Sequence, residues 1–134
     1  MEGEINQSLD GIKAVFLDLD GTIYLGDSLI DGALDFLGRL EIRGIKRYFL
    51  SNNSSKSVEQ YLEKLRELGI NAYKDEILLS THDLISWLSK KEVTSTFLVG
   101  TEGMRSMLEE RGIDTSAERP EFVVLGYDTE ISYE

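Results

Sequence analysis

Two aspartates follow an apolar stretch near the start of the chain. The segment reads AVFLDLDGT, with Asp18 and Asp20 two residues apart and Gly21 directly after them. Residues i and i+2 of a strand point to the same face, so both carboxylates should lie together at the end of a strand. Like charges in this arrangement repel each other unless a positive group lies between them. The pair therefore predicts a site for a divalent cation, typically Mg²⁺, which prefers oxygen ligands.

A second polar segment, SNNSS at residues 51–55, follows another apolar stretch. The side chains of Ser51, Asn52 and Asn53, with the N–H groups of a turn that leads into a helix, are neutral donors for phosphate oxygens. Taken alone, this segment is typical of an ordinary helix cap, and Asp18-x-Asp20-Gly21 of an ordinary turn. The combination of both segments after neighbouring strands favours a phosphate site.

Together the two segments predict phosphoryl transfer through a carboxylate nucleophile. Asp18 would attack phosphorus and form an acyl phosphate, while Asp20 would protonate the leaving alkoxide and then activate the hydrolytic water. Mg²⁺ would shield one phosphate oxygen from Asp18, and Ser51 would hold another. Because the stretch before Asp18 is wholly apolar and should be buried, we expect this carboxylate to be only partly solvated.

The elements that position these residues alternate between strand and helix. Apolar stretches predict strands at residues 13–19, 45–52, 76–80, 96–100 and 121–128. Apolar positions at helical spacing predict helices between them, and a small hairpin is expected at residues 22–30. This alternation indicates an α/β fold with a parallel sheet. Ligands of such sheets bind beyond the carboxyl ends of the strands, so both polar segments should lie on the same rim.

The predicted helices carry recognisable end signals. Three of them end on a glycine that an isoleucine follows: Gly44, Gly69 and Gly112. A left-handed glycine before an apolar residue is typical of a Schellman C-terminus. At the helix starts, Asp31 is expected to cap the first helix, and Ser57 to form a capping box with Gln60 in the second.

The composition excludes several classes of protein. The 134 residues carry a net charge of −11 and contain no cysteine. The charge argues against a nucleic-acid partner, and the lack of cysteine excludes disulfides and thiolate metal sites. No apolar run approaches the ~20 residues of a membrane span, and the polar start is unlike a signal peptide. We therefore expect a cytoplasmic protein without a membrane partner, and homo-oligomer formation stays open.

Several segments resemble one enzyme family. FLDLDGTIYLGD and FLSNNSS are similar to the first two motifs of the haloacid dehalogenase superfamily, and DGTIYLGDSLIDGA resembles its subfamily IIA of NagD-like and p-nitrophenyl phosphatases. TFLVGTEGM and PEFVVLGYDTEISYE resemble the opening of that subfamily's C2-type α/β cap domain. The resemblance implies a Rossmann-like core with a parallel sheet, whose N-terminal part spans residues 1–80. Residues 81–134 would be the first part of the cap.

The resemblance also assigns roles to the polar residues. It implies that Asp18 is the nucleophile and binds Mg²⁺ through its carboxylate. Asp20 would be the acid/base and would bind Mg²⁺ through its backbone carbonyl, while Ser51, Asn52 and Asn53 would hold the phosphate of a small phosphorylated metabolite. The family's lysine and its late G-D-x-x-x-D motif have no counterpart in the sequence, so the 134 residues alone are expected to be inactive.

The sequence is compatible with three functions. The first is a Mg²⁺-dependent phosphomonoester hydrolase, present here as its N-terminal half. The second is a non-catalytic phosphate-binding or regulatory module, which the missing late acidic motif would favour if the natural protein ended at Glu134. The third is a phosphomutase or phosphotransferase, which would share the Asp18 segment but use another acceptor; the resemblance to the cap favours hydrolysis.

Overall fold

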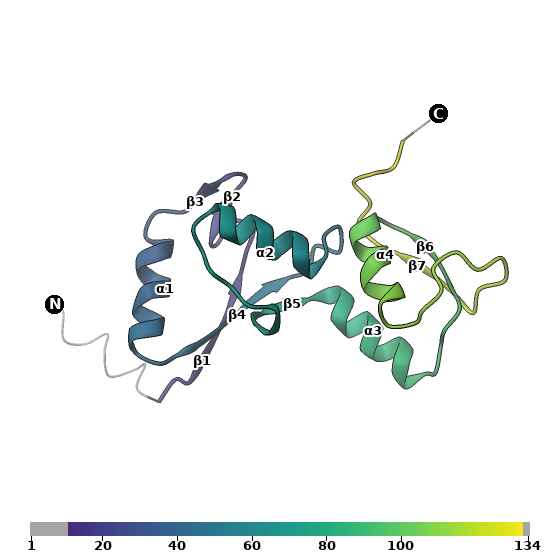
Figure 1. Ribbon diagram of the computed structural model, residues 1–134, viewed down its shortest axis with the longest axis horizontal. Helices are drawn as coiled ribbons and strands as arrows, with labels where there is room; N and C mark the ends of the chain where they lie inside the picture. Colours follow the sequence, from purple (N-terminus) through teal and green to yellow (C-terminus); the bar gives the residue numbers. More distant parts are fainter. Residues whose placement is uncertain (1–10, 133–134) are drawn as a thin grey trace. The chain divides into compact units, whose positions relative to one another are not determined.

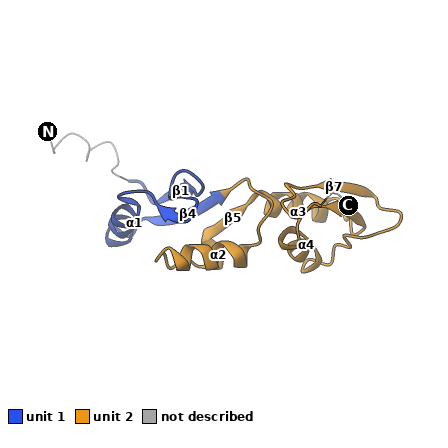
Figure 2. Cartoon of the chain, turned by 90° about the horizontal axis from the view of Figure 1, so that it is seen from above, with its two compact units in different colours: residues 1–50 blue, residues 51–134 orange. Residues whose placement is uncertain are grey.

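The computed structural model describes residues 11–132, and its strands and helices alternate along the chain (Figure 1). Contacts group the chain into two compact units, residues 1–50 and 51–134 (Figure 2). The expected boundary between residues 80 and 81 concerns the core and cap of a complete family fold, and it stays a prediction.

The first unit is built around two parallel strands. Its elements are β1 (Ala14–Asp18), β2 (Tyr24–Leu25), β3 (Ser28–Leu29), α1 (Ala33–Ile42) and β4 (Lys46–Ser51), whose last residue begins the second unit. The pairing of β1 with β4 runs from Ala14 opposite Lys46 to Asp18 opposite Leu50. The antiparallel pair β2–β3 confirms the predicted hairpin.

The two faces of β1 differ in burial. Leu17 and Leu19 are buried, whereas Phe16 on the opposite face is 59% exposed and stacks on Tyr48 with ring centroids 5.2 Å apart. Within residues 11–132, β1 pairs with β4 alone and ends the strand order of its sheet. The strand is therefore buried on one face only, although its sequence is almost continuously apolar.

The start of α1 differs from the sequence prediction. Gly32, not Asp31, is the N-cap, with φ of 84°, and no side chain caps this end. The N–H of Ala33 instead donates to the carbonyl of Ile30 at 3.0 Å, and that of Phe36 to Gly32 at 2.9 Å. A left-handed backbone at the cap position favours glycine over aspartate, so the capping residue moves by one.

The C-terminal ends of the helices confirm the predicted Schellman motifs. The N–H of Ile45 donates to the carbonyl of Leu40 at 2.9 Å, across the left-handed Gly44. The same six-residue bond closes the chain after the two other glycines, through Ile70 to Leu65 and Ile113 to Leu108. The ends of these helices were therefore readable from two adjacent residues in each case.

The second unit carries the remaining elements. They are α2 (Val58–Glu67), the 3₁₀ turn η1 (Lys74–Glu76), β5 (Ile77–Leu79), α3 (Ser80–Lys90), β6 (Thr96–Val99), α4 (Glu102–Glu109) and β7 (Phe122–Leu125). Helix α2 contacts η1 and β5, and α3 contacts β5 and α4. β6 and β7 are parallel, with Thr96 opposite Phe122. Both units thus pair strands in parallel next to helices, which confirms the predicted α/β class.

Side-chain caps begin both α2 and α4. Ser57 and Gln60 form the predicted capping box: the Ser57 N–H donates to Gln60 Oε1 at 2.8 Å, and the Gln60 N–H donates to Ser57 Oγ at 3.3 Å. Thr101 caps α4 by accepting from the Met104 N–H, and its hydroxyl donates to the carbonyl of Ser55 at 2.8 Å. In the described residues no helix is long and apolar enough to cross a membrane.

Candidate active site

The two aspartates stand where β1 ends. Asp18 is its last residue and Asp20 follows two residues later, while Leu17 and Leu19 point into the core. Strand alternation therefore turns both carboxylates to the opposite side, where both residues are exposed. Asp18 is more solvated than the sequence predicted, because nothing in residues 11–132 covers this face of β1 enough to bury it.

A tight turn fixes the backbone after Asp18. The carbonyl of Leu19 accepts from the N–H of Thr22 at 3.2 Å, and the N–H of Gly21 donates to the carbonyl of Tyr24 at 2.7 Å. The Thr22 hydroxyl lies 3.4 Å from Oδ2 of Asp18 and donates to it. Leu19 and Tyr24 are almost fully buried, so the turn is anchored in the core while its carboxylates face solvent.

The second polar segment begins at the end of β4. Ser51 is only 6% exposed, and its Oγ lies 2.8 Å from the hydroxyl of Tyr61. The same Oγ accepts from the N–H of Asn53 at 3.1 Å, and Oδ1 of Asn53 accepts from the N–H of Ser55 at 2.9 Å. Asn52 is exposed between them. The segment is thus an ordered turn that holds its own polar atoms.

Strand pairing relates the two segments. Asp18 is the register partner of Leu50, and Ser51 is the next residue of the same strand. Both polar segments therefore leave the carboxyl ends of two paired parallel strands, as the sequence predicted. Such ends are where ligands bind in parallel α/β sheets.

Sequence reasoning missed Tyr61. Its side chain is fully buried in α2, four residues after the Ser57 cap, and its hydroxyl is bonded to the Ser51 side chain. A buried tyrosine hydroxyl needs a polar partner, and the nearest polar segment in the sequence is SNNSS. A tyrosine among the leucines that face the core was therefore the available signal for this support of Ser51.

The donor set fits a magnesium ion held by few protein ligands. Asp18 and Asp20 offer carboxylate and carbonyl oxygens, and both residues are exposed. No group of three or more His, Cys, Asp or Glu residues suited to a metal occurs within residues 11–132. Mg²⁺ commonly binds through one or two carboxylates and completes its shell with water and substrate phosphate. An ion enclosed by protein ligands alone would need more than these residues supply.

Comparison with known proteins identifies related sequences and folds. A model of the haloacid dehalogenase-like hydrolases matches residues 15–114. An acid sugar phosphatase of Staphylococcus aureus is 37% identical over 124 residues, which are 91% of this chain and 48% of that protein. The chain therefore spans about half the length of the curated relatives that it matches.

Solved structures agree with this match. A 4-nitrophenylphosphatase from Thermotoga maritima superposes with a TM-score of 0.86 at 36% identity, over 93% of this chain and 48% of that one. NagD from E. coli K-12 reaches a TM-score of 0.80 at 21% identity, over 91% of this chain and 49% of the other, and shows a shared fold. The predicted resemblance to NagD-like and p-nitrophenyl phosphatases is confirmed.

Proposed function

Because the chain belongs to the haloacid dehalogenase-like hydrolase family, we propose that it supplies the nucleophile-bearing half of a Mg²⁺-dependent phosphomonoester hydrolase. The observation that carries the proposal is the pair Asp18 and Asp20, both exposed where β1 ends, beside the strand that leads into Ser51. Residues 1–80 would be part of the core domain, and residues 81–134 the first part of a cap.

The two aspartates have different roles in the proposed reaction. A carboxylate oxygen of Asp18 attacks phosphorus, the bond between phosphorus and the ester oxygen breaks, and Asp20 gives its proton to the leaving alkoxide. Asp20 then takes a proton from water, whose oxygen attacks phosphorus and releases phosphate and free Asp18. Asp18 and Asp20 would hold a Mg²⁺ ion, which would supply positive charge to offset the repulsion between carboxylate and phosphate. The Thr22 hydroxyl donates to Asp18 and restrains it.

The turn after β4 would bind the phosphate. Ser51 lies at the strand end with its hydroxyl set by Tyr61 and by the Asn53 N–H, and Asn52 is exposed beside it. Ser51, Asn52 and Asn53 would orient the transferred group by neutral hydrogen bonds. The relatives named above are an acid sugar phosphatase and a 4-nitrophenylphosphatase, so small sugar or aryl phosphates are the proposed substrate class.

A specific observation supports a second candidate, a non-catalytic phosphate-binding module. The Ser51 hydroxyl already has two partners inside the protein, and the residues described here hold no third acid beside Asp18 and Asp20 that would complete a metal site. A module of this kind would keep the polar turn and bind phosphate without forming a covalent intermediate.

Trapping of the covalent intermediate distinguishes the two. A polypeptide containing this chain, with any sequence that naturally follows it, is mixed with ³²P-labelled sugar phosphate and Mg²⁺ and quenched in acid. We expect label on the wild-type protein, none on Asp18→Asn, and slowly lost label on Asp20→Asn. Asp31→Asn removes an exposed charge outside the site and should behave as wild type. Label on Asp18→Asn would disprove the nucleophile assignment, and phosphate binding without any label would favour the binding module.

A further inference from the structure

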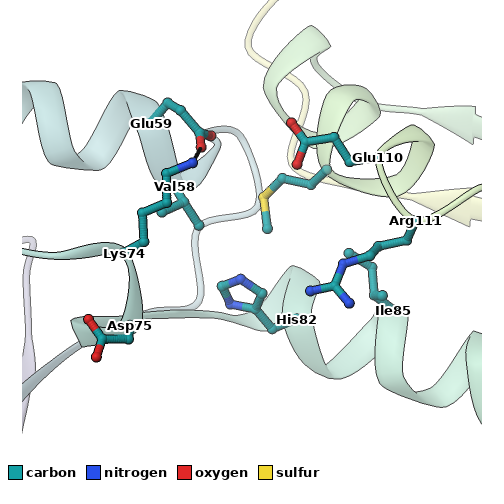
Figure 3. Close-up of a pocket in the computed structure, with 9 residues that line it drawn as sticks. Val58, Glu59, Lys74, Asp75, His82, Ile85, Glu110 and Arg111 are labelled. Carbon is teal, nitrogen blue, oxygen red and sulfur yellow. Dashed lines mark hydrogen bonds and ion pairs between the residues drawn. The ribbon is translucent and has the colours of Figure 1, made fainter.

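A groove lies beside α3, and all of its lining residues belong to the second unit. One part is a cavity of about 350 Å³ whose apolar wall is formed by Val58, Ile85 and Met107, all nearly buried (Figure 3). A second cavity of about 510 Å³ shares Ile85, His82 and Arg111 with the first. The shared residues make the two cavities one groove with an apolar part and a polar part, of a size that suits a small ligand.

His82 presents a hydrogen-bond donor to the groove. Its Nδ1 accepts from the N–H of Leu79 at 3.0 Å, which ties the ring to the start of α3. Burial lowers the pKa of His82 below its usual value, and the positive charge of Arg111 lowers it further. The neutral ring therefore carries its proton on Nε2, because Nδ1 is the acceptor.

The polar part of the groove is basic. It is lined by Arg111, which follows the C-cap of α4, and by Lys90, Ser86 and Ser89 on α3; no acidic residue lines it. Neither Arg111 nor Lys90 forms a side-chain ion pair with any residue that the structure describes. In a chain with a net charge of −11, two unpaired cations beside two hydroxyl groups form a local exception.

The apolar part has its own charges, and they are arranged differently. Lys74 pairs with Glu59 at 2.6 Å on one side, so their charges offset each other. Asp75 and Glu110 also line this part, and Figure 3 shows the guanidinium of Arg111 and the ring of His82 directed toward the same space. The Arg111 side of this cavity therefore favours an anionic group of a ligand. The Glu59 side disfavours a second anionic group, because its lysine is already paired with Glu59.

We propose that this groove binds a small organic dianion, with its charged group at Arg111, Lys90 and the hydroxyls of α3, and its apolar part against Val58, Ile85 and Met107. Guanidinium groups form paired, charge-assisted hydrogen bonds with both carboxylate and phosphate. The neutral His82 Nε2–H adds a donor between the two parts. Its residues all belong to the second unit, whereas the proposed catalytic aspartates belong to the first, so the two sites share no residue.

The test uses the only histidine of the chain as its reporter. The His82 ring signals are followed by NMR during titration with phenylphosphonate, with phenylsuccinate and with benzylammonium as a cationic control. We expect a saturable shift with at least one dianion and none with benzylammonium. Saturation by phenylphosphonate alone assigns a phosphate-type ligand, by phenylsuccinate alone a dicarboxylate, and by both a site that recognises charge.

Matched variants separate the site from the overall charge. Arg111→Gln should weaken the dissociation constant at least tenfold, about 1.4 kcal/mol. Arg119→Gln removes the same charge from an exposed arginine outside the groove and should stay within twofold of wild type. Asp18→Asn should leave the titration unchanged, so the result does not depend on the proposed catalysis. Absence of saturation, or equal weakening by both arginine variants, would overturn the proposal.

Discussion

Helix α4 approaches α2 at a glycine that leaves no room for a side chain. A Cβ added to Gly103 would lie 2.9 Å from the backbone nitrogen of Ser57 and 3.3 Å from the carbonyl carbon of Lys56, and it would also strike Oε1 of Gln60. Gln60 is the residue that closes the capping box on the Ser57 N–H. Gly103→Ala therefore forces apart α4 and the capped start of α2.

The magnitude follows from two opposing effects. Alanine is favoured over glycine within a helix by up to about 1 kcal/mol. Overpacking against backbone that cannot rotate away costs about 1–3 kcal/mol, and displacing Gln60 removes a hydrogen bond of about 1 kcal/mol. We expect Gly103→Ala to lower the free energy of unfolding by about 1–3 kcal/mol. For a chain of this length the melting temperature should fall by about 3–12 °C.

Gly38 in α1 is the matched control. It is also a helical glycine, its φ is not positive, and an added Cβ would meet nothing within 4 Å. Gly38→Ala should therefore stabilise the protein by about 0.5–1 kcal/mol. Thermal and urea unfolding of both variants, followed by circular dichroism, measures whether each substitution raises or lowers the free energy of unfolding. If Gly103→Ala were as stabilising as Gly38→Ala, the close approach of α4 to the α2 cap would be refuted.

Three further predictions concern other parts of the chain. Tyr61→Phe removes the hydroxyl bonded to Ser51 and should lower the free energy of unfolding by about 1–2 kcal/mol. Tyr73→Phe, at an exposed position, should leave the free energy of unfolding almost unchanged, and equal urea midpoints for the two variants would count against the buried bond. The folded-state pKa of His82 lies below the unfolded one, so the unfolded chain binds more protons between the two values. Wild-type stability should thus fall as pH drops below about 6.5, and His82→Gln should flatten this slope in urea unfolding measured across pH. An unchanged slope would contradict the prediction. An isolated polypeptide of residues 1–134 should self-associate through the open edge of β1 or fold poorly, and Phe16→Lys should shift its sedimentation toward that of a monomer. A well-folded wild-type monomer, shown by sedimentation and by dispersed amide NMR signals, would rule out this edge pairing.

The candidate site was partly readable from the sequence. The spacing of Asp18 and Asp20 predicts that they share one face wherever that segment is extended, and the structure shows both residues exposed. The solvent exposure of Asp18 could not be predicted from the sequence, because it depends on which other parts of the protein cover β1. The sequence stretch is apolar enough for burial on both faces, yet Phe16 is more than half exposed. Whether these aspartates act as proposed stays a prediction until the covalent intermediate is tested.

By itself, the sequence determined the alternation of elements, the helix ends at Gly44 and Gly69, and the Ser57 capping box. These features depend on hydrogen bonds and backbone sterics within five or six residues, so the identities of adjacent residues are enough to specify them. The family motifs were readable for the same reason, since each is a short continuous segment.

Only the tertiary structure decided which distant residues meet. It placed the Tyr61 hydroxyl on Ser51, the Thr101 hydroxyl on the carbonyl of Ser55, and Arg111 in one groove with His82. No local pattern encodes these partners, because they arise when helices from separate parts of the chain pack together and exclude water. Buried polar atoms then take whichever partner the packing brings within reach, and that choice depends on the whole core rather than on any short segment.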